Sequence, residues 1–87
     1  MEYFFVEMTD TYGGESNYSW VNRFIVKAST MRGAMCKVSR EVGSRTRKVM
    51  DCGDFQRYDV TGVCICFFVN YADDVEALRT MYKVKEL

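Results

Sequence analysis

The sequence contains no histidine and no proline, and only 6 of its 87 residues are glycine. Histidine is the side chain most often used in general acid–base catalysis and is a common zinc ligand, so its absence argues against a catalytic centre and a typical zinc site. The lack of proline and the low glycine content argue against a linker or a disordered tail. We therefore expect a single non-enzymatic domain over residues 1–87 that carries no cofactor and no metal.

No apolar run reaches the roughly 18–20 residues that cross a bilayer. The first residues, Met1 to Glu7, lack the basic region and the cleavage site of a signal peptide. These two absences predict a protein of the cytoplasm that makes no contact with membrane. The four cysteines are Cys36, Cys52, Cys64 and Cys66, and only the last two are close in sequence. We expect all four to be free, buried and apolar in character, without a disulfide or a metal role.

One uncharged stretch, Val63 to Val69, is the strongest structural signal. Its residues are β-branched, aromatic or cysteine, the types that fit a buried pleated strand. Because successive side chains of a strand point to opposite faces, both faces of this stretch are apolar, which predicts a strand inside a sheet.

Two strands are expected before it, Glu2 to Thr9 and Tyr18 to Ala28, joined by a loop over Asp10 to Asn17. In the second strand, Trp20 shares a face with Phe24 and is expected in the core.

An amphipathic helix follows at Met31 to Val42. Its apolar residues recur at helical spacing, Ser29 or Thr30 suits the N-cap, and Gly43 suits the C-terminal end.

The second half predicts a strand over Arg45 to Cys52, a short extended arm over Phe55 to Val60, and a turn at Thr61 and Gly62 before the central strand. A short helix capped by Asp73 is expected next. Residues 82–87 either form the end of this helix or form an edge strand. The fold class expected is α+β in two layers: a mixed, mainly antiparallel sheet of four to five strands with one long and one short helix on one face. A ferredoxin-like βαββαβ core is the alternative.

Charge is unevenly distributed although the formal net charge is zero. Residues 32–48 sum to +5 and residues 49–76 to −5, so one molecule can carry a basic and an acidic surface. The basic candidates are Arg32, Lys37, Arg40, Arg45, Arg47 and Lys48. The acidic and aromatic candidates are Asp51, Asp54, Tyr58, Asp59, Asp73, Asp74 and Glu76.

These patterns favour binding over catalysis. The close pairs Asp51/Asp54 and Asp73/Asp74 are typical of turns and helix caps, and no serine or cysteine has an activating base in the sequence. A basic face could bind nucleic acid, and Tyr12 and Tyr58, expected to be exposed, could anchor a protein partner.

The segments Tyr12 to Trp20 and Arg57 to Cys66, 19 residues together, resemble segments of small uncharacterised proteins encoded by phages and prophages. The short one-domain α+β plan is also similar to that of several anti-CRISPR proteins. The resemblance implies an inhibitor in the cytoplasm of a bacterial host, one that occupies a surface of a host protein or ribonucleoprotein complex. If that surface is a nucleic-acid channel, the inhibitor should present its acidic face to it. Nucleic-acid binding by residues 32–48 is the alternative function. The oligomeric state is left open.

Overall fold

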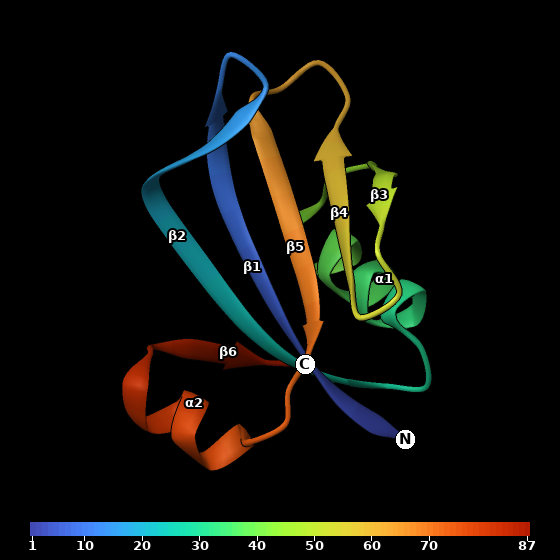
Figure 1. Cartoon of the computed structure of the whole chain (residues 1–87), viewed down its shortest axis with the longest axis vertical. Helices are drawn as coiled ribbons and strands as arrows, with labels where there is room; N and C mark the ends of the chain where they lie inside the picture. Colours follow the sequence, from blue (N-terminus) through green and yellow to red (C-terminus); the bar gives the residue numbers. More distant parts are fainter.

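A six-stranded mixed sheet forms the centre of the molecule (Figure 1). The computed structural model describes all 87 residues. In chain order the elements are β1 (Glu2–Tyr12), β2 (Glu15–Ala28), α1 (Met31–Val42), β3 (Thr46–Asp51), β4 (Phe55–Val60), β5 (Ile65–Tyr71), α2 (Val75–Met81) and β6 (Val84–Glu86). The strand order is β3-β4-β5-β1-β2-β6, antiparallel except for the β2–β6 pair. The α+β class is confirmed, with more strands than expected because the 55–60 arm and residues 84–86 both join the sheet.

β5 lies inside the sheet, between β4 and β1, as the uncharged run predicts. Phe67 and Val69 are fully buried on one face, and Cys66 is fully buried on the other. The strand begins two residues later than expected, because Val63 and Cys64 belong to the exposed turn that follows β4.

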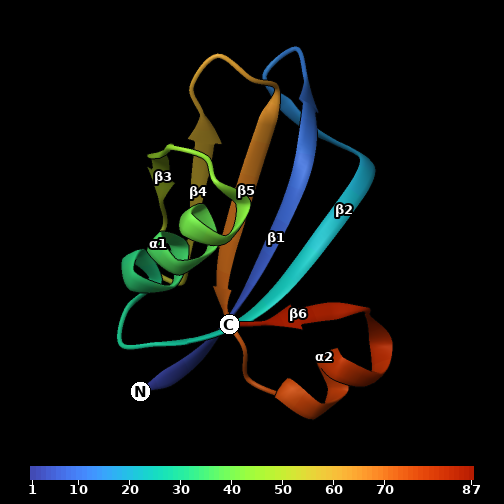
Figure 2. The same cartoon turned by 180° about the vertical axis from the view of Figure 1, so that it is seen from behind.

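α1 covers one face of the sheet and builds the core against it (Figure 2). Thr30 is its N-cap and accepts a hydrogen bond from the Gly33 amide, while Gly43 ends it in the left-handed conformation at φ 70°. Both caps were expected. The buried side chains that α1 contributes are Met31, Ala34, Met35 and Val38. They pack with Phe4, Val6, Phe24, Val26, Tyr58, Phe67 and Val69 from the strands.

The second helix does not share that layer, which corrects the expected arrangement. α2 has no buried residue, and it leads into β6 at the outer edge of β2. Tyr82, just after α2, stacks on Phe5, a residue that points to the face opposite α1. The N-cap is Asp74, which accepts from the Ala77 amide, rather than Asp73.

The ferredoxin-like alternative is also wrong. That fold needs the strands on either side of its first helix to lie one strand apart in the sheet. The alternative leaves out the first strand and the 55–60 arm, but these strands, β1 and β4, lie inside the sheet. β1 pairs with both β2 and β5, so β2 and β5 run in the same direction and are not the antiparallel neighbours that the ferredoxin-like fold requires.

The β1–β2 hairpin is longer than expected, because residues 10–17 are mostly strand and only Gly13 and Gly14 form the turn. Both glycines have positive φ, 62° and 85°, as a tight two-residue hairpin turn requires. The pairing register shifts between Thr9 and Thr11, where a bulge bends the hairpin.

The cysteines differ from expectation in burial. Only Cys66 is buried, Cys36, Cys52 and Cys64 are exposed, and all four are free thiols. Neither helix has the length and apolar character that a bilayer crossing requires.

Two substitutions to aspartate within the same uncharged run should behave differently. Phe67→Asp places an unpaired charge in the core and should prevent folding, because such burial costs several kcal/mol. Val63→Asp, at a side chain that is 54% exposed, should change the free energy of unfolding by no more than about 0.5 kcal/mol. Urea unfolding followed by circular dichroism compares the two, and similar behaviour would contradict the position assigned to β5.

Candidate nucleic-acid interface

α1 covers the part of the sheet that ends in β3, the outermost strand on that side (Figure 2). The Ser39 and Thr46 hydroxyls share a hydrogen bond of 2.7 Å that joins the helix to the strand. Only three residues separate α1 from β3, so the chain reverses tightly at Gly43 and keeps the two elements together. A groove therefore runs between α1 and β3, and we call it the basic groove.

Two adjoining cavities make up the basic groove, and both include Cys36 and Thr46. The cavity near the start of α1, here the N-terminal cavity, has a volume of about 400 Å³. Its lining residues are Arg32, Met35, Cys36, Thr46, Arg47, Lys48 and Tyr58. The cavity near the end of α1, here the C-terminal cavity, has a volume of about 460 Å³. Its lining residues are Cys36, Ser39, Arg40, Ser44, Arg45 and Thr46.

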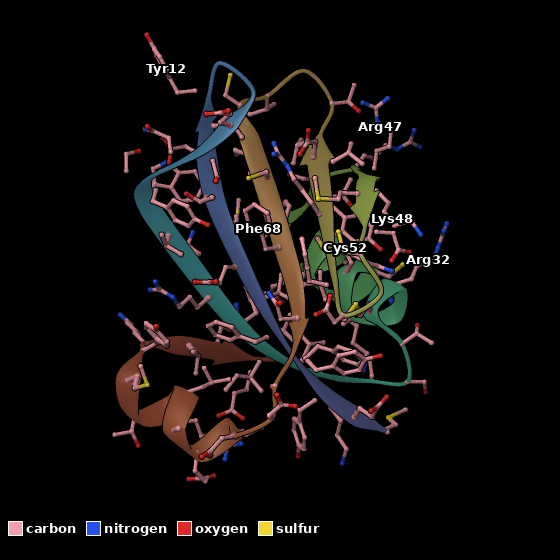
Figure 3. All side chains as sticks on the ribbon, in the orientation of Figure 1. Tyr12, Arg32, Arg47, Lys48, Cys52 and Phe68 are labelled. Carbon is pink, nitrogen blue, oxygen red and sulfur yellow. The ribbon has the colours of Figure 1, made fainter.

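Five of the six basic candidates line this groove: Arg32, Arg40, Arg45, Arg47 and Lys48. None of the four arginines among them forms an ion pair; Arg40 donates only to the Cys36 carbonyl. Figure 3 shows Arg32, Arg47 and Lys48 extending from the same edge of the molecule. The sixth, Lys37, lies outside the groove and donates to the Lys27 carbonyl at 2.6 Å.

Lys48 is the one cation of the groove with a carboxylate partner. It pairs with Asp51 at 3.0 Å. The Gly53 amide, followed by Lys48, lowers the pKa of Asp51, so this carboxylate stays charged beside Lys48.

The acidic candidates do not gather in the same way. Asp51 and Asp54 flank the β3–β4 turn, and Asp59 on β4 pairs with Arg57 at 3.0 Å. Asp73, Asp74 and Glu76 belong to the α2 end of the molecule, where Asp74 caps the helix and Glu76 pairs with Arg79 (Figure 1).

Tyr58 is part of the core rather than an exposed anchor. Its side chain is 5% exposed, and its hydroxyl donates to Gln56 Oε1 at 2.7 Å. Burial raises the pKa of Tyr58, so the phenol stays neutral beside the arginines of the groove.

Several residues of the groove were not among the sequence candidates, namely Met35, Cys36, Ser39, Ser44 and Thr46. The sequence of the helix contains a weak indication of the groove. Arg32, Cys36 and Arg40 recur every four residues and therefore share one helical face. The contribution of β3 could not be seen, because it depends on where the strand packs beside α1.

The β1–β2 hairpin tip, residues 10–20, is a second distinctive surface. Its side chains of Tyr12, Tyr18 and Trp20 are 81%, 53% and 39% exposed. The exposure of Tyr12 is as expected, whereas Trp20 was expected in the core. The bulge takes both Tyr18 and Trp20 out of the regular alternation, and Tyr18 has the left-handed backbone at φ 56°.

Hydrogen bonds hold the hairpin tip in this shape. The Asp10 carboxylate accepts from the Ser19 hydroxyl, the Ser19 amide and the Asn17 side chain. The Ser19 hydroxyl, followed by Asn17, lowers the pKa of Asp10 well below its ordinary value. Across the sheet, Arg57 donates to the Gly14 carbonyl at 2.8 Å, so the tip curves over the face opposite α1.

No group of three or more His, Cys, Asp or Glu side chains is placed to hold a metal ion. No family model, curated protein or solved structure matches the chain. The geometry of the structure is therefore the support for the candidate sites.

Asp10→Asn should destabilise the hairpin tip at neutral pH, because the amide nitrogen of Asn cannot accept hydrogen bonds. The folded-state pKa of Asp10 lies below the unfolded value of about 3.9, so its stabilisation is complete above that pH and is lost as the pH falls through the folded value. The difference in unfolding free energy between wild type and variant should shrink on acidification.

Urea unfolding at several pH values, followed by the fluorescence of Trp20, the only tryptophan, measures this difference. Asp54→Asn is the control, since the Asp54 side chain forms no ion pair. Equal pH profiles for the two variants would contradict the role given to Asp10.

Proposed function

We propose that this protein binds nucleic acid, with its basic groove against the phosphodiester backbone. The observation that supports this function is the gathering of four arginines without ion-pair partners, together with Lys48, around two adjoining cavities. Guanidinium groups bind phosphate oxygens with two parallel hydrogen bonds, and release of counterions from the polyanion drives association.

The composition of the groove fits contact with phosphates more than readout of sequence. Arg40, Arg45, Ser39 and Ser44 at the C-terminal cavity are donors of the kind that contact phosphate and sugar oxygens. Such contacts position a strand and carry no sequence information. The protein should therefore bind many sequences with similar affinity.

Of the two charged candidate sets, the structure brings together the basic one. The acidic residues are divided between the β3–β4 turn, β4 and the α2 end. Several of them already form hydrogen bonds or ion pairs with residues close to them in the sequence. A single docking surface is therefore better supported for the basic set than for the acidic set.

Removing a groove cation should weaken nucleic-acid binding and its dependence on salt. Arg32→Ala and Arg45→Ala should each reduce the slope of log affinity against log salt by about 1, since each removes one phosphate contact. Fluorescence anisotropy with labelled oligonucleotides at low and physiological salt measures the slope.

Lys37→Ala is the matched control for Arg32→Ala, because it removes the same charge from the same helix outside the groove. The control should keep the wild-type slope. An absence of binding at low salt, or an equal effect of Lys37→Ala, would contradict the proposed function.

A protein-binding function is the second candidate, and the exposed aromatic residues of the hairpin tip favour it. Tyrosine and tryptophan anchor many protein interfaces, and a surface already held in shape loses less entropy on binding. The inhibitor of a host defence complex, of the anti-CRISPR kind, stays a prediction, and on this structure the hairpin tip is its better contact surface.

If the tip is such a contact, Tyr12→Ala should weaken binding to its target by about tenfold or more, because interface anchors cost more than about 1 kcal/mol on truncation. Purified bacterial CRISPR effector complexes, immobilised on a biosensor, are the first targets to titrate. Tyr3→Ala is the control, since Tyr3 is exposed at the other end of β1. Equal affinities of the two variants for a bound complex would argue against the tip.

A further inference from the structure

The outer edge of β2 is paired over only part of its length. β6 runs parallel to β2 and pairs with it from Arg23 to Ile25, whereas β2 extends back to Glu15 without a strand on that side. In Figure 1, β6 meets β2 near the C-terminus of the chain and diverges from it toward α2. The part of β2 next to this divergence, residues 21–23, therefore has one unpaired side, and we call it the open edge.

Backbone groups of the open edge point outward. The Leu87 amide donates to the Ile25 carbonyl at 2.9 Å, and the Lys27 amide donates to the Leu87 carbonyl at 3.2 Å. Odd-numbered residues of this part of β2 therefore face β6. By the two-residue period of a strand, the N–H and C=O of Val21 and the N–H of Arg23 point the same way. They form no hydrogen bond to β6 or to the residues next to it, and such groups are a template for another strand.

A cavity of about 510 Å³ adjoins the open edge, between β2, β6 and the end of α1. We call it the edge cavity. Val21, Val42 and Val84 are part of its lining, and each of them is partly exposed, so each offers apolar surface to a ligand. Cavities of about 300–1,000 Å³ that combine apolar walls with a few polar groups bind organic ligands. The edge cavity therefore suits an aliphatic side chain.

Positive charge predominates around the edge cavity. Lys85 pairs with Glu41, the one acid of the lining. Arg23 pairs with Glu7 on β1. Lys83 is exposed and forms no ion pair, so it is available to a carboxylate. One unpaired cation beside aliphatic walls and backbone donors matches an acidic peptide better than a chain of phosphates.

We propose that the open edge binds an extended segment of a protein partner as an added strand, with an aliphatic side chain in the edge cavity and a neighbouring carboxylate against Lys83. The added strand would continue the pairing that β6 already makes with β2. In strand addition, backbone hydrogen bonds supply affinity and pockets for side chains supply specificity. The open edge and the basic groove lie at opposite sides of the sheet, so this inference goes beyond the proposed function and does not depend on it.

Three synthetic peptides of about seven residues, the length of a short strand, test the inference. One alternates Glu with Val, the second alternates Lys with Val, and the third alternates Glu with Ser. Fluorescence of Trp20, which precedes the open edge and is 39% exposed, follows the titrations. The Glu–Val peptide should bind about fivefold or more tightly than either of the others, because only it offers both the carboxylate and the aliphatic side chain.

Hydrogen exchange identifies the binding mode. Bound Glu–Val peptide should slow exchange of the Val21 and Arg23 amides by about tenfold or more, because an added strand accepts their hydrogen bonds. Contact by side chains alone would leave the exchange of these amides unchanged.

A charge exchange tests the contact with Lys83. Lys83→Glu should weaken binding of the Glu–Val peptide by about fivefold and strengthen binding of the Lys–Val peptide, an exchange of preference that misfolding cannot produce. Lys27→Glu is the matched control, because it makes the same change on β2 outside the lining of the edge cavity. The control should keep the wild-type preference.

Several results would overturn the inference: no binding of the Glu–Val peptide up to about 1 mM, binding without protection of the two amides, or equal effects of Lys83→Glu and Lys27→Glu. Protection of these amides by an oligonucleotide would assign the edge to nucleic acid instead. Protection that rises with protein concentration in the absence of peptide would assign it to a second copy of the chain. None of these peptide results bears on the basic groove, so failure here is distinct from failure of the proposed function.

Discussion

The packing of α1 onto one face of the sheet is the interaction on which the rest of the structure depends. Its four buried side chains meet apolar residues of β1, β2, β4 and β5, and each larger one contributes about 1.5–3 kcal/mol of burial. The opposite face has no such helix and is covered in part by the curved hairpin tip and by Tyr82. Because α1 continues to β3 after a three-residue turn, the same packing that forms the core also places the arginines of the helix beside those of the strand.

Elements with a strong local pattern could be predicted from the sequence. The helical spacing of Met31, Met35 and Val38 and the caps at Thr30 and Gly43 located α1, because each signal acts within a few residues. Features that depend on distant pairing were missed. Tyr58 lies in a short polar segment, and only its pairing with Phe67 turns it into the core. Trp20 alternates with Phe24 in sequence, yet the bulge near Asp10 separates their environments.

The same distinction between local patterns and distant packing applies to the candidate site. The six basic residues were recognisable by composition, and five of them do line one groove. The exclusion of Lys37 follows from its position on α1, which directs its ammonium group to the Lys27 carbonyl. Met35 reads as core from the helix pattern and is core, whereas the burial of Tyr58 beneath the groove could not be foreseen, because it depends on the packing of β4. The acidic residues all lie within residues 51–76, but they are dispersed because the β3–β4 turn, β4 and the start of α2 lie in different parts of the fold.

A formal net charge of zero does not prevent this protein from binding a polyanion. The molecule measures 34 × 24 × 24 Å, while charges in physiological salt are screened over about 8 Å. Carboxylates at the α2 end therefore contribute little to the field in the basic groove. The nearer acids are Asp51, which pairs with Lys48, and Asp59, which lies opposite Arg47 on β4. In the proposed complex a strand in the groove would meet a local excess of positive charge rather than the neutral total. The balancing negative charge on other parts of the surface would limit non-specific attraction and so would confine the proposed binding of nucleic acid to the groove.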